Sequence, residues 1–155
     1  MTYLEIGENN QFQIDGFKRY ARIVGSADDD EIRGFVRAAI LYVQEVADFA
    51  LLPCKIEIEG EGRCLQLWQP IIATIECVQN LDTGDDVKAD CTVLGRIITM
   101  PYAGRWRVTY TTQPNHVKAE ELRPCVYKIS AALYDGDTEE EAKAKASIPA
   151  GYVVS

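Results

Sequence analysis

Histidine and closely paired cysteines, the side chains from which most zinc sites are built, are scarce in this sequence. The chain has a single histidine, His116, in 155 residues. A structural zinc site needs four ligands that usually come in close pairs, so we expect no metal site. The cysteines stand at wide, irregular spacings with no Cys-x-x-Cys pair, and we expect reduced thiols, most of them buried, at Cys54, Cys64, Cys77, Cys91 and Cys125.

Catalytic and membrane-targeting motifs are also missing. The sequence has no Gly-rich phosphate loop, no Gly-x-Ser-x-Gly and no His-Glu-x-x-His. We therefore expect no enzyme activity, no catalytic residue and no cofactor. Residues 1–10 lack the basic start and the apolar run of a signal peptide, and apolar runs such as 38–43 are too short to cross a bilayer. These absences favour a protein that works by binding other protein chains.

The overall composition is that of an ordinary globular protein with an excess of acid. Apolar residues make up 47% and charged residues 26%, and the length suits a single domain over 1–155. Aspartate and glutamate number 24 against 16 lysines and arginines, which gives a formal net charge of −8. Because such a surface repels the phosphate backbone, general nucleic-acid binding is disfavoured.

The clearest periodicity in the sequence predicts a long amphipathic helix from Asp28 to about Leu51. Apolar residues, with Ile40 near the middle, recur there every three or four positions. Asp28 and Glu31 have the spacing of a capping box, and their charge suits the positive end of a helix dipole better than a metal site. Pro53 is expected to stop this helix.

Two further helices are indicated by weaker patterns. Residues 11–24 indicate a strand or turn followed by a short helix, with Asp15 as the N-cap and Val24 on the apolar side. Pro124 suits the first turn of a helix near the C-terminus, which Gly136 ends.

Between residues 54 and 112 the apolar period changes to two, which predicts strands. Ile56 and Ile58 alternate with charged residues, and the turn signal at 60–62 predicts a hairpin with a second strand at 64–68. The strands should be antiparallel, since no helix-length crossover separates them. The predicted fold class is α+β, a helical core of a long amphipathic helix and a C-terminal helix with short antiparallel strands between, the later strands lying near 71–78, 92–100 and 105–111.

The order of these pieces resembles the head–tail connector (adaptor) family of tailed phages, over about residues 14–136. The resemblance lies in Ala21-Arg22-Ile23 at the end of the opening helix, the acidic start of the long helix, and the passages YVQEVADFALLPC, WQPIIATIECVQNLDTGD, WRVTYTT and RPCVYKISAALYDG. The family's usual basic residue before Leu-Leu-Pro is absent, since Phe49-Ala50 stands there.

The resemblance implies a structural subunit of a ring of about a dozen copies at the head–tail interface of a virion, assembled in the host bacterial cytoplasm. Its partners would be other copies of itself, the portal protein, and a stopper or tail-completion protein. The ring would line the channel through which DNA passes, with DNA as repelled cargo and no membrane partner. A different class of function stays open: a small, β-rich, monomeric module that binds a protein or peptide.

The basic residues of the last strands form one candidate interface with a neighbouring subunit or the portal. Arg105 and Arg107 share one face of a predicted strand, while Trp106 faces the core with Val108. Together with Arg96 they form a local basic strip on an acidic protein. A head-to-tail ring needs two different, complementary patches on each subunit, and such a strip could serve as one of them.

The C-terminal segment is the second candidate interface. Residues 137–147 carry Glu-to-Lys pairs four residues apart, which favour a helix, but have no apolar stripe. Apolar residues follow directly at Ile148, Tyr152, Val153 and Val154. Residues 137–155 could therefore be an extended arm that reaches another chain, or 148–155 could fold back on the protein's own core.

Overall fold

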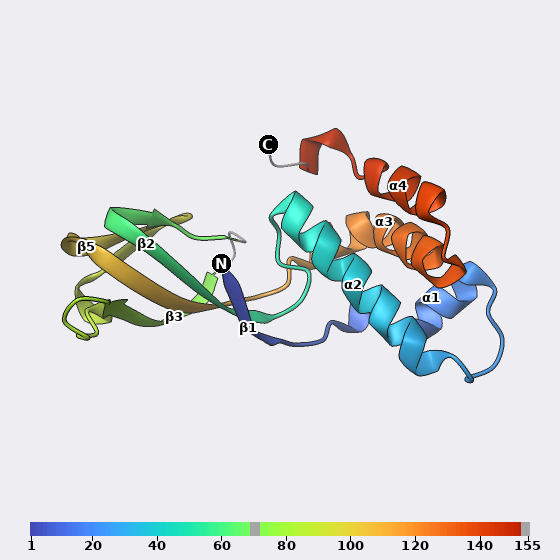
Figure 1. Cartoon of the computed structure of the whole chain (residues 1–155), viewed down its shortest axis with the longest axis horizontal. Coiled ribbons are helices and arrows are strands. Elements are labelled where there is room, and N and C mark those ends of the chain that lie inside the picture. Colours follow the sequence, from blue (N-terminus) through green and yellow to red (C-terminus); the bar gives the residue numbers. More distant parts are fainter. Residues whose placement is uncertain (69–71, 153–155) are drawn as a thin grey trace. The chain divides into compact units, whose positions relative to one another are not determined.

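The computed structural model describes residues 1–68 and 72–152, and the chain divides into two compact units (Figure 1). The sheet unit contains Met1–Glu8 and Leu52–Pro114, and the helical unit contains Asn9–Leu51 and Asn115–Ser155. Each unit is thus assembled from segments far apart in sequence. The predicted α+β class is confirmed. The single domain over 1–155 stays a prediction.

Within the described residues, the sheet unit is one five-stranded sheet in which every pairing is antiparallel, as predicted. The strand order is β1-β2-β5-β3, and β4 pairs with the first residues of β5. Sequence periodicity missed the first strand, because it is only five residues long and its apolar residues, with Tyr3 next to Leu4, do not alternate strictly with polar ones. The strands are β1 (Thr2–Ile6), β2 (Cys54–Gln66), β3 (Ile72–Asn80), β4 (Thr92–Leu94) and β5 (Ile97–Thr112), with a short 3₁₀ turn at Lys88–Asp90.

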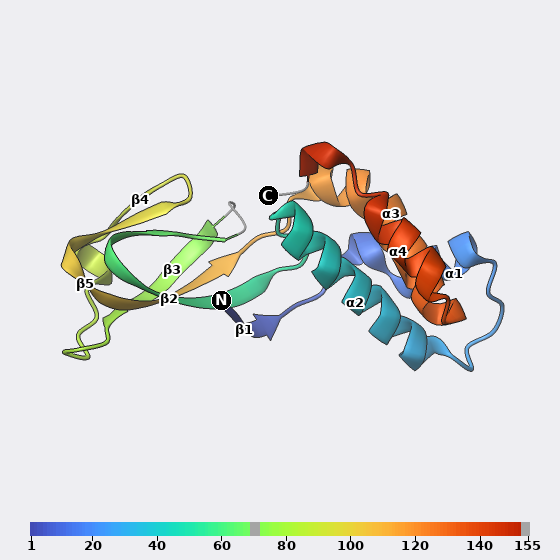
Figure 2. The ribbon, with the colours of Figure 1, turned by 45° about the horizontal axis from the view of Figure 1, so that its top comes forward.

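The hairpin predicted at residues 60–62 is wrong, because β2 continues through this point as one bent strand (Figure 2). The register with β5 jumps here, from Gly62 opposite Gly104 to Cys64 opposite Thr99, so β5 carries a large bulge. Gly62 has φ +115°, a conformation that an L side chain rarely adopts, and its glycine makes the bend possible.

Beyond the bend, the second half of β2 folds over the buried face of its first half. The Trp68 backbone N–H donates to the Tyr110 hydroxyl at 2.9 Å, which joins the end of the folded-over part to the middle of the sheet. Trp106 is fully buried, and its indole N–H donates to the Gly62 carbonyl at 2.9 Å. The alternation of Trp106 and Val108 toward the core is therefore confirmed.

The helical unit is built around two long helices, α2 (Asp29–Ala47) and α3 (His116–Asp135), which pack against each other in antiparallel orientation. The predicted apolar stripe of α2 is confirmed, since its inward residues are buried. The short α1 (Ile14–Ala21) packs against both through Phe17, whose ring lies 5.9 Å from that of Tyr127 on α3. The remaining pieces are α4 (Thr138–Ala146) and 3₁₀ turns at Asn10–Phe12 and Ala150–Tyr152.

The ends of α2 differ from those predicted. Asp28 is the N-cap residue but makes no side-chain capping bond, so the capping box with Glu31 does not form. Its carboxylate instead accepts a 2.8 Å hydrogen bond from the Tyr134 hydroxyl of α3. The helix ends at Asp48, which adopts the left-handed conformation with φ 53°. Pro53 lies five residues further on and therefore does not stop the helix. The Gln44 side chain then accepts from the Leu51 N–H at 2.9 Å and fixes the exit of the chain.

The other two helix predictions also need correction. Gln13, and not Asp15, is the N-cap of α1, and this helix ends so early that Val24 is 97% exposed in the following loop. Pro124 lies inside α3 and not in its first turn, because Asn115 begins the helix by accepting from the Lys118 N–H at 3.1 Å. Gly136 ends α3 in the left-handed conformation, as predicted.

Truncation of Ile40 tests whether the α2 stripe supports the helical unit. Ile40→Ala removes a buried side chain from the middle of α2 and should lower the free energy of unfolding by about 2–5 kcal/mol. The exposed Glu45 of the same helix serves as the control, since Glu45→Ala should change stability by less than about 0.5 kcal/mol. Thermal melts of the two variants that coincide would show that the stripe does not carry the core.

Candidate interaction surfaces

The structure separates the three arginines of the predicted basic strip. Arg107 pairs with Glu59 directly opposite on β2, at 2.6 Å, and approaches Glu57 at 3.7 Å. The hydrogen bond to Glu59 and the two nearby charges raise the pKa of its guanidinium above the ordinary value. Arg105 pairs with Asp82 at 3.1 Å. Both arginines are therefore engaged within the chain, and their contact with another subunit stays a prediction.

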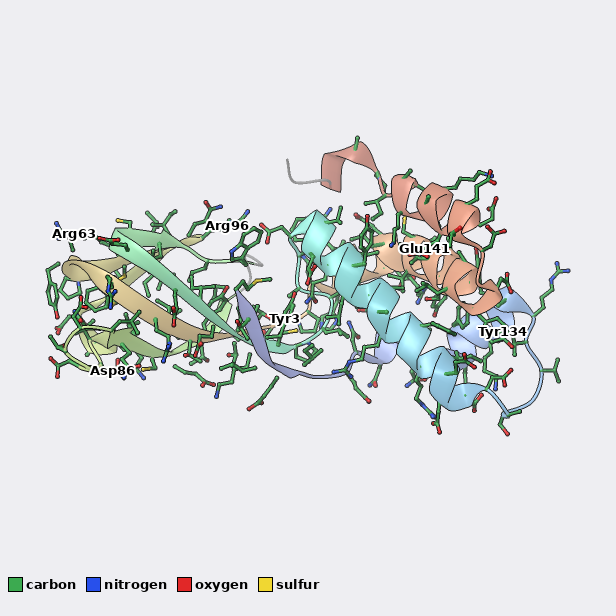
Figure 3. All side chains as sticks on the ribbon, in the orientation of Figure 1. Tyr3, Arg63, Asp86, Arg96, Tyr134 and Glu141 are labelled. Carbon is green, nitrogen blue, oxygen red and sulfur yellow. The ribbon has the colours of Figure 1, made fainter. Side chains whose placement is uncertain are left out.

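Arg96 occupies a different place, in the tight turn between β4 and β5. Its backbone carbonyl accepts from the Leu67 N–H at 2.7 Å, and its Nε lies 3.5 Å from the Leu67 carbonyl. Figure 3 shows Arg96 and Arg63 at opposite ends of the folded-over part of the sheet unit. Residue type alone groups Arg96 with Arg105 and Arg107, but Arg96 lies beyond the bend of β2 and β5, away from the other two.

Three exposed apolar residues, Trp68, Leu94 and Ile97, lie near Arg96. We call these three residues together with Arg96 the hairpin tip. Leu94 is 82% exposed, and Trp68 and Ile97 are 44% and 42% exposed. Of the hairpin tip, the sequence singled out Arg96 but not Trp68, Leu94 or Ile97. The available signal was the run Val93-Leu94-Gly-Arg-Ile97-Ile98, in which consecutive apolar residues break the alternation of a half-buried strand and place apolar side chains on both faces.

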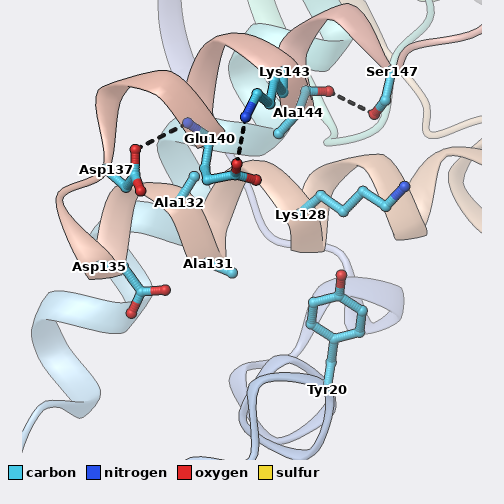
Figure 4. A pocket seen from close by; sticks show the side chains of 10 residues that line it. All are labelled: Tyr20, Lys128, Ala131, Ala132, Asp135, Asp137, Glu140, Lys143, Ala144 and Ser147. Atoms are coloured by element: carbon cyan, nitrogen blue, oxygen red, sulfur yellow. Dashed lines mark hydrogen bonds and ion pairs between the residues drawn. The ribbon is translucent and has the colours of Figure 1, made fainter.

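An open groove lies in the helical unit between α1, α3 and α4 (Figure 4). Its volume is about 420 Å³, and its lining includes three alanines, Ala131 and Ala132 of α3 and Ala144 of α4. Polar side chains at the rim serve local structure: Asp137 caps α4, and Lys143 pairs with Glu140 at 2.9 Å. The lining residues of the groove are Tyr20, Lys128, Ala131, Ala132, Asp135, Asp137, Glu140, Lys143, Ala144 and Ser147.

The C-terminal segment begins as predicted and then packs on its own unit. Both expected ion pairs of α4 form, Glu139–Lys143 at 2.8 Å and Glu141–Lys145 at 2.5 Å. Although α4 has no apolar stripe, it lies along α3, and Ile148 just after it is buried.

Ile148 therefore belongs to the fold of the helical unit, in agreement with the fold-back alternative for this residue. The backbone of Tyr152 lies in the last 3₁₀ turn, and Val153 and Val154 lie outside the described residues. A role of Tyr152, Val153 and Val154 in binding another chain stays a prediction.

Among residues 1–68 and 72–152, no group of histidine, cysteine and carboxylate side chains is arranged to hold a metal ion. His116, in the first turn of α3, contacts the Gln11 side chain through Nδ1 at 3.1 Å, and not a nucleophile. Cys54 and Cys125 are buried, Cys77 and Cys91 are half-buried, and Cys64 is exposed; none of the five forms a disulfide. In the same described part of the chain, no helix has the length and apolar character required to span a membrane.

Comparison with solved structures finds the same fold in gene transfer agent (GTA) particles. A chain in the neck of an empty GTA particle, determined with C6 symmetry, matches with a TM-score of 0.65 at 16% identity, over 87% of this chain and 84% of that chain. A chain in the virion of a native GTA particle matches with a TM-score of 0.67 at 16% identity, over 86% and 83%.

A third match, from the neck of a native GTA particle with C12 symmetry, has a TM-score of 0.58 at 16% identity, over 89% of this chain and 85% of that chain. No protein-family model matches the sequence, and no curated protein sequence matches it either. The similarity is thus one of fold, and it extends over nearly the whole length of both chains.

Truncation of Ile148 tests whether the C-terminal segment is part of the helical unit. Ile148→Ala should lower the free energy of unfolding by about 2 kcal/mol, because a buried side chain is removed near the edge of the core. Val117→Ala is the control, since Val117 is mostly exposed on α3 and its truncation should leave the melt nearly unchanged. Equal melting temperatures for Ile148→Ala and the wild type would show that residues after α4 do not pack in solution.

Proposed function

We propose that the chain is a structural subunit of the neck of a phage-like particle, a head–tail connector that assembles into a ring on the portal and binds a stopper or tail protein. The observation that carries the proposal is the fold that this chain shares with two chains from GTA necks and one from a GTA virion, over 86–89% of its length. The order of the helices and strands along the chain, which resembles that of the connector family, supports the same proposal.

Ring formation is the second element of the proposal. The solved necks with which this chain shares its fold have C6 and C12 symmetry. A ring requires a heterologous contact in which two different patches of one chain meet. The hairpin tip, the groove of the helical unit and the surface around the Arg105–Asp82 and Arg107–Glu59 pairs are distinct, so the chain offers the unlike surfaces that such a contact needs.

The proposed role is structural and needs no catalytic group. The described residues contain no metal-binding cluster, and in the groove of the helical unit Lys143 pairs with Glu140 while Asp137 caps α4. An enzyme would require a positioned base or nucleophile. The described surfaces are better suited to binding protein.

Native mass spectrometry with the portal protein of the same particle tests the proposal. The purified chain should bind the portal as a complex containing about a dozen copies of the chain. An unrelated acidic protein of similar mass should not bind, and the portal alone sets the baseline. A chain that stays monomeric at every concentration and does not bind the portal would contradict the connector role. That result would favour a monomeric module that binds a protein or peptide.

Removal of residues 152–155 tests the proposed terminal contact. Because Ile148 is retained, the truncated chain should melt as the wild type does, and its affinity for the portal or for neighbouring copies should fall. Wild-type affinity for both would show that Tyr152, Val153 and Val154 make no contact with another chain.

The proposed ring should not retain duplex DNA. A ring of a dozen copies, each with a formal charge of −8, carries roughly −100 before counterion screening. Acidic groups along a channel repel phosphates and let DNA pass without adhering. We therefore expect no shift of a duplex in a gel assay at physiological salt, with or without portal. Tight, salt-sensitive retention would contradict the passive channel.

A further inference from the structure

The hairpin tip has the geometry of a docking surface. Leu94 on β4 pairs with Ile97 on β5, so their side chains lie next to each other on the same face of the sheet. Gln66 of β2 continues this row on the other side of Ile97. Trp68 lies close by, because the preceding Leu67 is hydrogen-bonded to Arg96. Tryptophan and arginine within an exposed apolar cluster are the residue types enriched at the centre of protein interfaces.

The charge of the hairpin tip is positive, against the acidic average of the protein. The two segments that meet there, residues 62–75 and 91–104, contain no aspartate or glutamate, and Arg96 is the only charged residue of 91–104. A partner for this surface should therefore combine exposed apolar groups with carboxylates.

The loop between α1 and α2, with the first turn of α2, has that combination; we call residues 24–31 the acidic loop. Val24 is 97% exposed, and the segment holds four carboxylates and no basic residue. Asp29 is engaged by Lys18 at 2.6 Å, and Asp28 by Tyr134. Asp30 is fully exposed and forms an ion pair with the exposed Arg33 at 2.8 Å.

We propose that the hairpin tip of one copy docks on the acidic loop of a second copy, with Leu94, Ile97 and Trp68 against Val24, and Arg96 against Asp30. The occupant is a second copy because both complementary surfaces belong to this one chain. A contact between unlike surfaces is heterologous, and repetition with the right rotation closes a ring. This inference rests on the proposed function, since it names the two faces through which neighbouring connector subunits meet.

Two charge-reversed variants test the contact, Arg96→Glu in the hairpin tip and Asp30→Arg in the acidic loop. Each variant alone should associate at least about tenfold more weakly than the wild type in sedimentation velocity at low salt, since every contact in the sample then places like charges together. An equimolar mixture of the two should regain association. In the mixture, the intact hairpin tip of Asp30→Arg can meet the intact acidic loop of Arg96→Glu. The altered tip of Arg96→Glu can likewise meet the altered loop of Asp30→Arg, so both contacts join opposite charges.

Controls use the same charge changes elsewhere on the chain. Lys88→Glu lies in the sheet unit and Glu45→Arg on α2, both on exposed residues outside the two proposed surfaces. Both should associate as the wild type does. Leu94→Ser should weaken association while leaving its salt dependence unchanged, because it removes apolar contact and no charge. Thermal melts verify that each variant folds. If Asp30→Arg does not fold, Glu31→Arg takes its place in the experiment.

The outcomes separate this contact from the proposed function. If the wild type associates, and Arg96→Glu and Leu94→Ser associate as strongly as it does, the hairpin tip is not an interface. The connector role would then be unaffected. Weak association of both charge variants with no recovery on mixing would overturn the pairing of tip and acidic loop, and assign the tip to another surface or to the portal. A wild-type chain that never associates, with or without portal, would overturn both.

Discussion

The burial of Trp106 against the bend of β2 is the constraint on which the sheet unit depends. Its indole donates to the Gly62 carbonyl at the point where the strand changes direction, and its ring lies so close to Gly104 that a β-carbon there would be 3.2 Å from it. Two strands that would otherwise extend as a flat sheet therefore fold back, and their apolar faces cover each other. Beyond the bend, the register of β2 with β5 pairs Gln66 with Ile97 and brings Leu67 to Arg96, which positions the hairpin tip.

The sequence predicts the long-range features of the fold best where periodicity is strong. The stripe of α2 and the alternation around Trp106 follow from the energetic advantage of burying one face, and both are present. Helix ends and the bend were mispredicted for a common reason, namely that tertiary contacts compete with local signals. Asp28 is taken by Tyr134 and does not cap its own helix, while the glycines at 60 and 62 bend a continuous strand where sequence suggested a turn.

The candidate surfaces were harder to predict than the fold, because residue type does not reveal the partner of a charge. Arg105 and Arg107 look like interface residues in sequence, yet the strand register places Glu59 opposite Arg107, and Asp82 lies within reach of Arg105. Ile148 looks like part of an arm and is buried. Conversely, Leu94 and Val24 look like ordinary apolar residues and are exposed, because a turn and an early helix end leave them outside the core. These exposed residues give the molecule unlike surfaces, which a head-to-tail assembly requires.

Cryo-electron microscopy of the chain mixed with the portal of its particle tests the connector role most directly. The proposed function predicts a closed ring of this chain, with rotational symmetry, seated on the portal around a central channel. Each subunit should show one sheet unit and one helical unit, and unlike surfaces of neighbouring copies should meet all around the ring. Portal particles that carry no ring, in a sample where the chain is present in excess and folded, would contradict it.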